Sequence, residues 1–349
     1  MKKTLLALAV VAAAGSVNAA EIYKSEDGAV DFYGQLRTEL RFEDSEDHEA
    51  DLSSGSSRAG IDGQYALTDS VDVLGLVEFG LRDNTDVNVR QHILGFSGDF
   101  GTIKLGKQWT TSDDVYGADY SYFYGGSALR YLTLNGAAHD SQVKYAYDAD
   151  NFWVKAGWGL NENEKNQDLY ELFVGTSVGD LALHVGAGLN RDYAFVTNAK
   201  AVADNDATAE KADLENLFFE FTAEYSIGDH LIGFTYYNAE VSENGSSNKI
   251  DENAFSVAGS FQATDKTAVY AGYEFVDQSV NVGGLEDGDG TLFYVGTVHK
   301  FNSWSRVYAE YAYADGTTLG YSNKGSDQVV GATLADSESN FAVGARFYW

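Results

Sequence analysis

The 349-residue sequence contains no cysteine and no proline. Without cysteine the chain can form neither a disulfide framework nor a thiolate metal site. Without proline every residue keeps its backbone N–H donor, which suits an extensive ladder of hydrogen-bonded strands. The 37 glycines, 23 tyrosines and 20 phenylalanines agree with this, because aromatic side chains pack well on paired strands. The composition therefore predicts an all-β chain.

Basic residues are scarce, with 23 Lys and Arg against 53 Asp and Glu and a formal net charge of -30. Neutralising phosphates requires the opposite sign, so nucleic acid is excluded as a partner. The six histidines show neither H-E-x-x-H spacing nor close pairing, and we expect no metal and no other cofactor. Mean hydropathy is -0.27. With no second long apolar run, no transmembrane helix of roughly 20 apolar residues is expected.

The first residues form the one long apolar run. Two lysines precede the run from Leu5 to Ala14, and small residues follow up to Ala19. This pattern predicts a secretory signal over residues 1–19, cleaved before Ala20. We expect the mature chain, residues 20–349, to be exported through the periplasm. Loss of two lysines leaves 21 basic against 53 acidic residues, a net charge of -32.

A strict period of two marks the stretch from Asp31 to Glu43. One set of alternate residues is apolar or small: Phe32, Gly34, Leu36, Thr38, Leu40 and Phe42. The other set is polar: Asp31, Tyr33, Gln35, Arg37, Glu39, Arg41 and Glu43. This alternation is typical of a strand with two unlike faces. It recurs over residues 59–67, 71–81, 217–225 and 307–313.

Short turns alternate with longer polar segments along the chain. The turns are expected at residues 67–70, 97–101, 148–151, 178–180, 227–230, 263–266 and 302–303. The longer loops are expected near residues 44–57, 83–88, 111–138, 161–167, 191–213, 241–252, 277–290 and 315–338. Together they predict one domain of 16 strands in an up-and-down meander, with both chain ends at the short turns. Outer-membrane barrels separate short and long connections in this way.

Closure of the first strand onto the last would leave no sheet edge exposed to hydrocarbon, where unpaired backbone groups cost several kcal/mol. The apolar faces would then contact lipid and the charged faces would line a water-filled lumen. The C-terminal "FAVGARFYW" fits, because Phe341, Val343, Ala345, Phe347 and Trp349 fall on one side. The sequence therefore predicts an all-β, 16-stranded antiparallel transmembrane β-barrel in the cell outer membrane.

The stretch "AEIYKSEDGAVDFYG", residues 20–34, closely resembles the mature start of the general diffusion porins of Gram-negative outer membranes, the matrix porin and osmoporin group. The similarity continues through "SRAGIDG" from Ser57, "GTIKLGKQW" over residues 101–109 and "YGG" at Tyr124. The resemblance covers the mature chain. It implies a homotrimer of 16-stranded barrels, in which the third loop folds into each lumen.

The resemblance also implies a pore constriction, in which acids on the third loop face basic residues on the opposite wall. Arg58 and Arg90 match two of the wall arginines, and Arg130 matches a third. The family's lysine position holds Gln35, with Arg37 two residues on, and Arg82 is a further lumen candidate. Asp119 matches the loop aspartate. The family's loop glutamate falls on Phe123, so Asp113 and Asp114 are candidates to replace its charge. Phe123 and Tyr124 are expected to narrow the opening.

These features predict a channel for passive diffusion of ions and small hydrophilic solutes, with weak cation selectivity. Outer-membrane lipid and lipopolysaccharide are the expected surroundings. An alternative is a solute-selective channel of related architecture, which a cluster of lumen lysines would indicate; none stands out in the sequence. A barrel enzyme is disfavoured because such enzymes use about 10 to 12 strands. The "GTSVG" around Ser177 lies in a strand before a tight turn and lacks the strand-to-helix elbow of a hydrolase.

Overall fold

The computed structural model describes residues 19–42, 50–81, 87–134, 136–161, 167–196, 211–319, 332–334 and 337–349. The strands of the first half are β1 (Ala20–Lys24), β2 (Gly28–Phe42), β3 (Asp51–Ser53), β4 (Arg58–Thr68), β5 (Val71–Leu81), β6 (Val87–Gly98), β7 (Gly101–Trp109), β8 (Ala138–Asp148), β9 (Phe152–Gly159) and β10 (Gln167–Val178). Those of the second half are β11 (Leu181–Val196), β12 (Lys211–Ile227), β13 (His230–Glu243), β14 (Lys249–Thr264), β15 (Thr267–Asn281), β16 (Gly288–Asn302), β17 (Ser305–Leu319), β18 (Ala332–Leu334) and β19 (Glu338–Tyr348). The helical segments are α2 (Thr111–Val115) and η2 (Arg130–Leu132).

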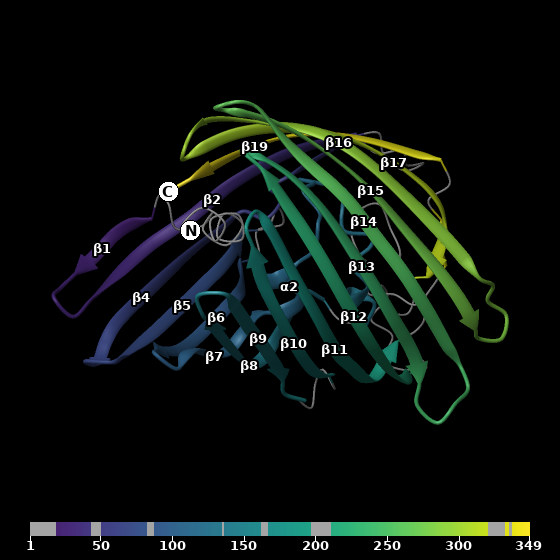
Figure 1. Ribbon diagram of the computed structural model, residues 1–349, viewed down its shortest axis with the longest axis horizontal. Coiled ribbons are helices and arrows are strands. Elements are labelled where there is room, and N and C mark those ends of the chain that lie inside the picture. Colours follow the sequence, from purple (N-terminus) through teal and green to yellow (C-terminus); the bar gives the residue numbers. More distant parts are fainter. Residues whose placement is uncertain are drawn as a thin grey trace.

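The strands close into an antiparallel barrel (Figure 1). Sixteen described strands form the ring, in which each main strand pairs with the next along the chain. The ring closes where β19 pairs with β2, from Phe341 opposite Phe42 to Tyr348 opposite Gln35. Beyond that point β1 pairs with β2 instead. The predicted fold class is confirmed, and closure leaves no open edge in the ring.

The two faces of each strand differ as the alternation predicts. On β2 the exposed large side chains are Leu36 and Phe42, at 52% and 42% exposure, whereas Glu39 is fully buried. The same inversion recurs around the ring: Leu172 on β10 is 54% exposed and its neighbour Glu171 is 5% exposed. Apolar side chains outside and carboxylates inside suit a barrel whose outer surface contacts hydrocarbon.

The connections follow the sequence pattern, and all seven expected short turns are confirmed. Several long strands extend a few residues beyond the expected loop boundaries; β11, for example, reaches Val196. The short strands β1, β3 and β18 were not predicted, because they are additions to the ring without the long alternating pattern. The predicted signal over residues 1–19 lies outside the described residues except for Ala19. Among the described residues, no helix is long and apolar enough to cross a membrane.

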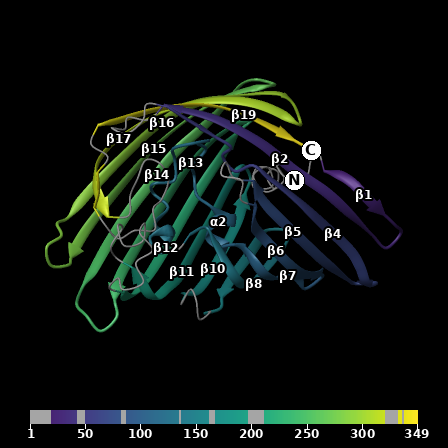
Figure 2. The ribbon, with the colours of Figure 1, turned by 180° about the vertical axis from the view of Figure 1, so that it is seen from behind.

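Inward aromatic rings explain part of the glycine content. A Cβ at Gly272 would come within 2.2 Å of the Tyr294 ring, and one at Gly296 within 2.2 Å of the Tyr270 hydroxyl. Glycine thus lets each tyrosine lie flat across the neighbouring strand. These flattened rings leave space inside the barrel. The third loop, which joins β7 to β8, occupies part of that space, and α2 lies within the outline of the barrel in both views (Figures 1 and 2).

Candidate functional site

The third loop begins as a short helix held by a wall carboxylate. The Thr110 hydroxyl caps α2 by accepting the backbone N–H of Asp113 at 3.2 Å. Glu171, which projects inward from β10, accepts the backbone N–H groups of Thr111 at 2.6 Å and Ser112 at 3.1 Å. These first N–H groups of a helix have no partner within the helix. The wall glutamate therefore fixes where the loop enters the lumen.

Two more wall glutamates hold the loop further along by the same device. Glu310 on β17 accepts the backbone N–H groups of Tyr122 at 2.7 Å and Tyr124 at 2.9 Å. Glu274 on β15 does so for the loop backbone from Gly126 to Ala128, at 2.9 and 3.0 Å. Backbone N–H groups that are buried away from water are costly unless an acceptor satisfies them. The loop is therefore anchored along the inner wall by buried carboxylates.

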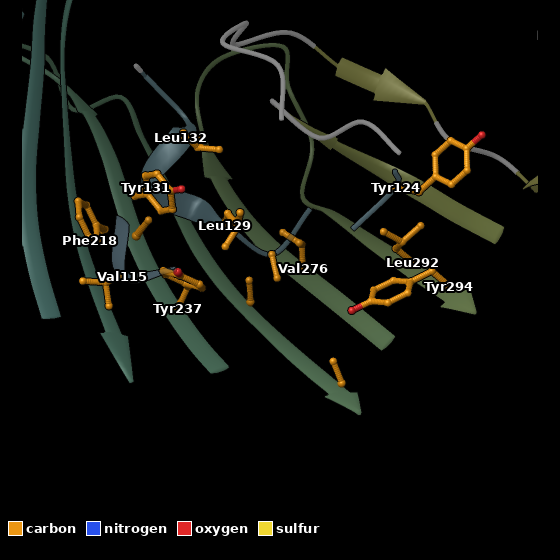
Figure 3. Close-up of a cluster of buried hydrophobic side chains, with 14 of the residues drawn as sticks. Val115, Tyr124, Leu129, Tyr131, Leu132, Phe218, Tyr237, Val276, Leu292 and Tyr294 are labelled. Atoms are coloured by element: carbon orange, nitrogen blue, oxygen red, sulfur yellow. The ribbon is translucent and has the colours of Figure 1, made fainter. Parts of the chain in front are cut away.

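A hydrophobic cluster fixes the return of the loop (Figure 3). Tyr131 of η2 is fully buried, with its ring 6.0 Å from Phe218 on β12 and 6.2 Å from Tyr237 on β13, between ring centroids. Val115 and Leu129 belong to the same cluster. Such tilted aromatic pairs stabilise packing beyond the area they bury.

The tip of the third loop contacts arginines on β2 and β19, the two strands that close the ring. The Arg37 guanidinium on β2 donates to the carbonyl oxygen of Tyr122 at 3.2 Å. Arg346 on β19 lies 5.0 Å from the Tyr122 ring centroid, and Arg41 lies 5.9 Å from that of Phe123. These cation–π contacts attach the tip of the loop to β2 and β19. The loop thus extends from β10 to β17 and β2.

The remaining wall carries the two arginines that match the family pattern. Arg58 on β4 and Arg90 on β6 share Glu78, with Nε–Oε distances of 3.3 and 2.9 Å. The Arg90 guanidinium also lies 4.8 Å from the ring centroid of Trp109. The side chains of Arg58 and Arg90 are 29% and 19% exposed. One carboxylate thus faces two guanidinium groups, so it only partly neutralises the positive charge of this wall.

A cavity of about 1850 Å³ separates this wall from the loop. Its loop side includes Asp113, Asp114, Asp119 and Phe123, and its wall side includes Arg58. It extends to the short turns, where Asp180, Asp229 and Asp265 line it. The lumen is thus a charged space, open along the part of the wall that the third loop leaves uncovered.

The loop acids differ in their surroundings. Asp114 forms an ion pair with Lys144 on β8. Burial by the surrounding protein, together with the Asp114 carboxylate, raises the pKa of Asp113 to about 7. Asp119 accepts hydrogen bonds from the Tyr116 hydroxyl at 3.1 Å and from the backbone N–H of Ser121 at 2.9 Å. The loop therefore presents three carboxylates to the cavity, and burial places the pKa of Asp113 near neutral pH.

The structure corrects the placement of two candidates. Arg130 lies in η2, inside the loop, with 2% exposure and its guanidinium bound to Glu252. It is not on the opposite wall, since the loop backbone turns it toward β14. Tyr124 is 1% exposed and packs against the wall near Leu292 (Figure 3), so it anchors the loop without lining the opening. Arg82 lies outside the described residues.

Sequence reasoning missed the loop-binding glutamates Glu171, Glu274 and Glu310. Each occupies an inward position of an alternating strand, so each was indistinguishable from an ordinary solvated lumen acid. It also missed a group of lumen lysines. Lys104 on β7 is the direct cross-strand partner of Lys144 on β8; Lys155 of β9 lines the same cavity.

The segment around Ser177 forms a strand followed by a tight turn, as expected. Ser177 lies near the end of β10, which continues through the turn at Gly179 into β11, so the hydrolase elbow does not form there. No group of three or more metal-ligating side chains that could hold an ion occurs in the described part of the chain.

A closed ring of sixteen strands, apolar outside and charged within, with a loop folded along its lumen, defines a transmembrane channel barrel. A family profile described as Gram-negative porin matches residues 5–319. The chain belongs to this family and is an outer-membrane protein. The family's members are channels, and the chain therefore belongs to a group of transport proteins.

Individual relatives of the chain are also outer-membrane proteins. The chain is 27% identical over 326 residues to the porin-like protein H of Photobacterium profundum, covering 90% of this chain and 95% of the relative. It is 57% identical to the in-vitro folded OmpT of Vibrio cholerae, with a TM-score of 0.85, covering 95% of this chain and all of that one. A trimer form of that protein is also known. An anion-selective porin from Comamonas acidovorans shares the fold at 16% identity, with a TM-score of 0.73, covering 93% of this chain and all of that one.

Proposed function

We propose that the protein is a water-filled channel for passive diffusion of ions and small hydrophilic solutes, with weak cation selectivity. The observation that carries this proposal is the cavity of about 1850 Å³ between the third loop and the β4–β8 wall, lined by charged side chains. Such a lining hydrates polar solutes that hydrocarbon would exclude. We include Arg37, Arg58, Arg90, Asp113, Asp114, Asp119 and Phe123 in the narrow region, and we leave out Arg130.

The charge along the cavity supports the direction of selectivity. Acidic side chains outnumber basic ones, both at the loop, with Asp113, Asp114 and Asp119, and at the short turns. Salt screens each charge over roughly 8 Å at physiological ionic strength, so only charges near the ion path act strongly. Basic side chains on the wall oppose them. The expected preference is therefore weak.

Planar bilayers test the selectivity, and liposomes test the solute range. In a KCl gradient the reversal potential should show a weak preference for potassium. A clear chloride preference would contradict the selectivity. Swelling of liposomes should slow smoothly as sugars grow larger. A sharp preference for one sugar would favour the alternative, a solute-selective channel, and impermeable liposomes would refute the channel function.

The assembly and surroundings are part of the proposal. The trimer form of the Vibrio cholerae relative suggests a homotrimer here, and small outward residues such as Ala59 and Gly63 on β4 and Gly75 on β5 suit a flat contact between subunits. Outer-membrane lipid and lipopolysaccharide would cover the remaining outer surface. Crosslinking before denaturing electrophoresis should give a threefold mass. A monomer at every crosslinker concentration would contradict the trimer.

We also propose that residues 1–19 are a secretory signal and that residues 20–349 form the mature barrel domain. Ala20 is the first residue of β1, and that strand pairs with β2. N-terminal sequencing of protein from outer membranes should read Ala20, Glu21, Ile22. An intact Met1 would refute the cleavage.

A further inference from the structure

Three lysines converge on one patch of the inner wall. Lys104 and Lys144 are direct cross-strand partners on β7 and β8, a position with roughly 5 Å between Cβ atoms. Lys155 on β9 pairs with Ala146, so it is a diagonal neighbour of Lys144 at roughly 7 to 8 Å. All three line the cavity. In the sequence they are dispersed, and only the strand register brings them together.

The patch has an excess of positive charge. Asp114 of α2 forms an ion pair with Lys144, and Lys144 also donates to the carbonyl oxygens of Trp109 at 2.9 Å and Thr110 at 3.3 Å. Lys144 therefore also holds the start of the third loop against the wall. Among the described residues, Lys104 and Lys155 form no ion pair. Both line a cavity in which acidic side chains outnumber basic ones.

Like charges placed opposite one another on adjacent strands destabilise a sheet. A small anion with two or more charges offsets this repulsion, because it can contact several ammonium groups at once. Each ammonium offers three donors without a fixed direction, which suits the oxygens of a tetrahedral oxyanion. A monovalent anion such as chloride gains about half as much from each lysine. The patch therefore favours compact polyvalent oxyanions.

We propose that Lys104, Lys144 and Lys155 form a binding site for polyvalent oxyanions of the phosphate or pyrophosphate type inside the channel. The site deepens the proposed channel function and rests on it, since solutes would reach the patch through the lumen. Asp113 and Asp114 of the loop line the same cavity. Their negative charges limit the affinity of the site for anions. Anions would pause at the site, while the acidic remainder of the lumen keeps the overall preference for cations.

Calorimetric titration with pyrophosphate tests the site without requiring conduction. The full mature protein, folded in detergent at roughly 0.1 M salt, should bind pyrophosphate. At that salt each lysine should contribute about fivefold to the dissociation constant. K104Q and K155Q should each weaken binding about fivefold, and the double variant about 25-fold if the effects are independent. Lys144 is left intact because it also holds the loop.

Lys300→Gln is the matched control. Lys300 lines the same cavity from β16, outside the three lysine-bearing strands, and its replacement removes the same charge. It should change pyrophosphate binding by less than about twofold. The proposal is overturned if the native protein does not bind pyrophosphate, or if the K104Q/K155Q variant binds as tightly as K300Q. KCl conductance, measured separately, tests the channel itself, so the two proposals can fail independently.

Discussion

Removal of the Glu310 carboxylate should release the tip of the third loop. This carboxylate accepts the N–H groups of Tyr122 and Tyr124 and the Tyr270 hydroxyl, at 2.7, 2.9 and 2.8 Å. The adjacent residues Ala309 and Tyr311 point to the other face of β17, and the next inward positions, Tyr308 and Ala312, carry no carboxylate. We therefore expect Glu310→Ala to weaken the docking of the tip while leaving the barrel hydrogen bonds intact.

The magnitude follows from the two backbone bonds. A hydrogen bond to a charged group stabilises by about 1.5–3 kcal/mol. Lumen water can hydrate the released N–H groups, so the lower figure applies and the loss is about 3 kcal/mol. Since 1.4 kcal/mol is a factor of ten, the ratio of detached to docked tips should rise about 100-fold. Glu274 and Arg37 still hold the flanks of the tip, so the detached state should be transient.

Single-channel recording in planar bilayers measures this change. Glu310→Ala should show a higher mean conductance and additional current noise, and a double variant with Glu274→Ala should show more of both. Glu240→Ala is the matched control: this carboxylate lies on β13, is 45% exposed and pairs with Lys249 at 3.1 Å. Conductance and noise that are unchanged in both the single and the double variant would refute the proposed anchoring.

Three further predictions concern the cavity. Because burial raises the pKa of Asp113 to about 7, the carboxylate gains a proton as the pH falls from 8 to 6, and the preference for potassium should decrease over that range. The Asp113→Asn variant should lose this pH dependence. An identical pH profile in both proteins would contradict the prediction. Glu78→Gln should leave Arg58 and Arg90 without their shared carboxylate and lower the potassium-to-chloride permeability ratio about twofold, whereas an unchanged reversal potential would exclude Glu78 from the ion path. Phe123→Ala should raise single-channel conductance because the ring lines the cavity; equal conductance would mean that the ring does not limit the opening.

Some of the site could be predicted from the sequence and some could not. Arg58 of the motif "SRAGIDG" lines the cavity, as the resemblance implied, and Arg90 shares Glu78 with it, because a strand fixes which side a residue faces. Arg130 was misplaced since the family match could not follow the backbone inside the loop, where η2 turns the side chain onto Glu252. The place of Phe123 in the third loop could be predicted, but its neighbours could not, such as the Tyr308 ring, whose centroid lies 5.1 Å from that of Phe123.

The sequence by itself determined the strands, their turns and which face of each is apolar, because a period of two and turn composition act over a few residues. From those local rules the count of strands and the closed barrel followed. Only the tertiary structure decided which inward charges meet. Tyr122 and Glu310 are 188 residues apart in the chain, and Lys104 faces Lys144 through strand register alone. Contacts of this kind depend on the path of the loop and the closure of the ring, which no local pattern encodes.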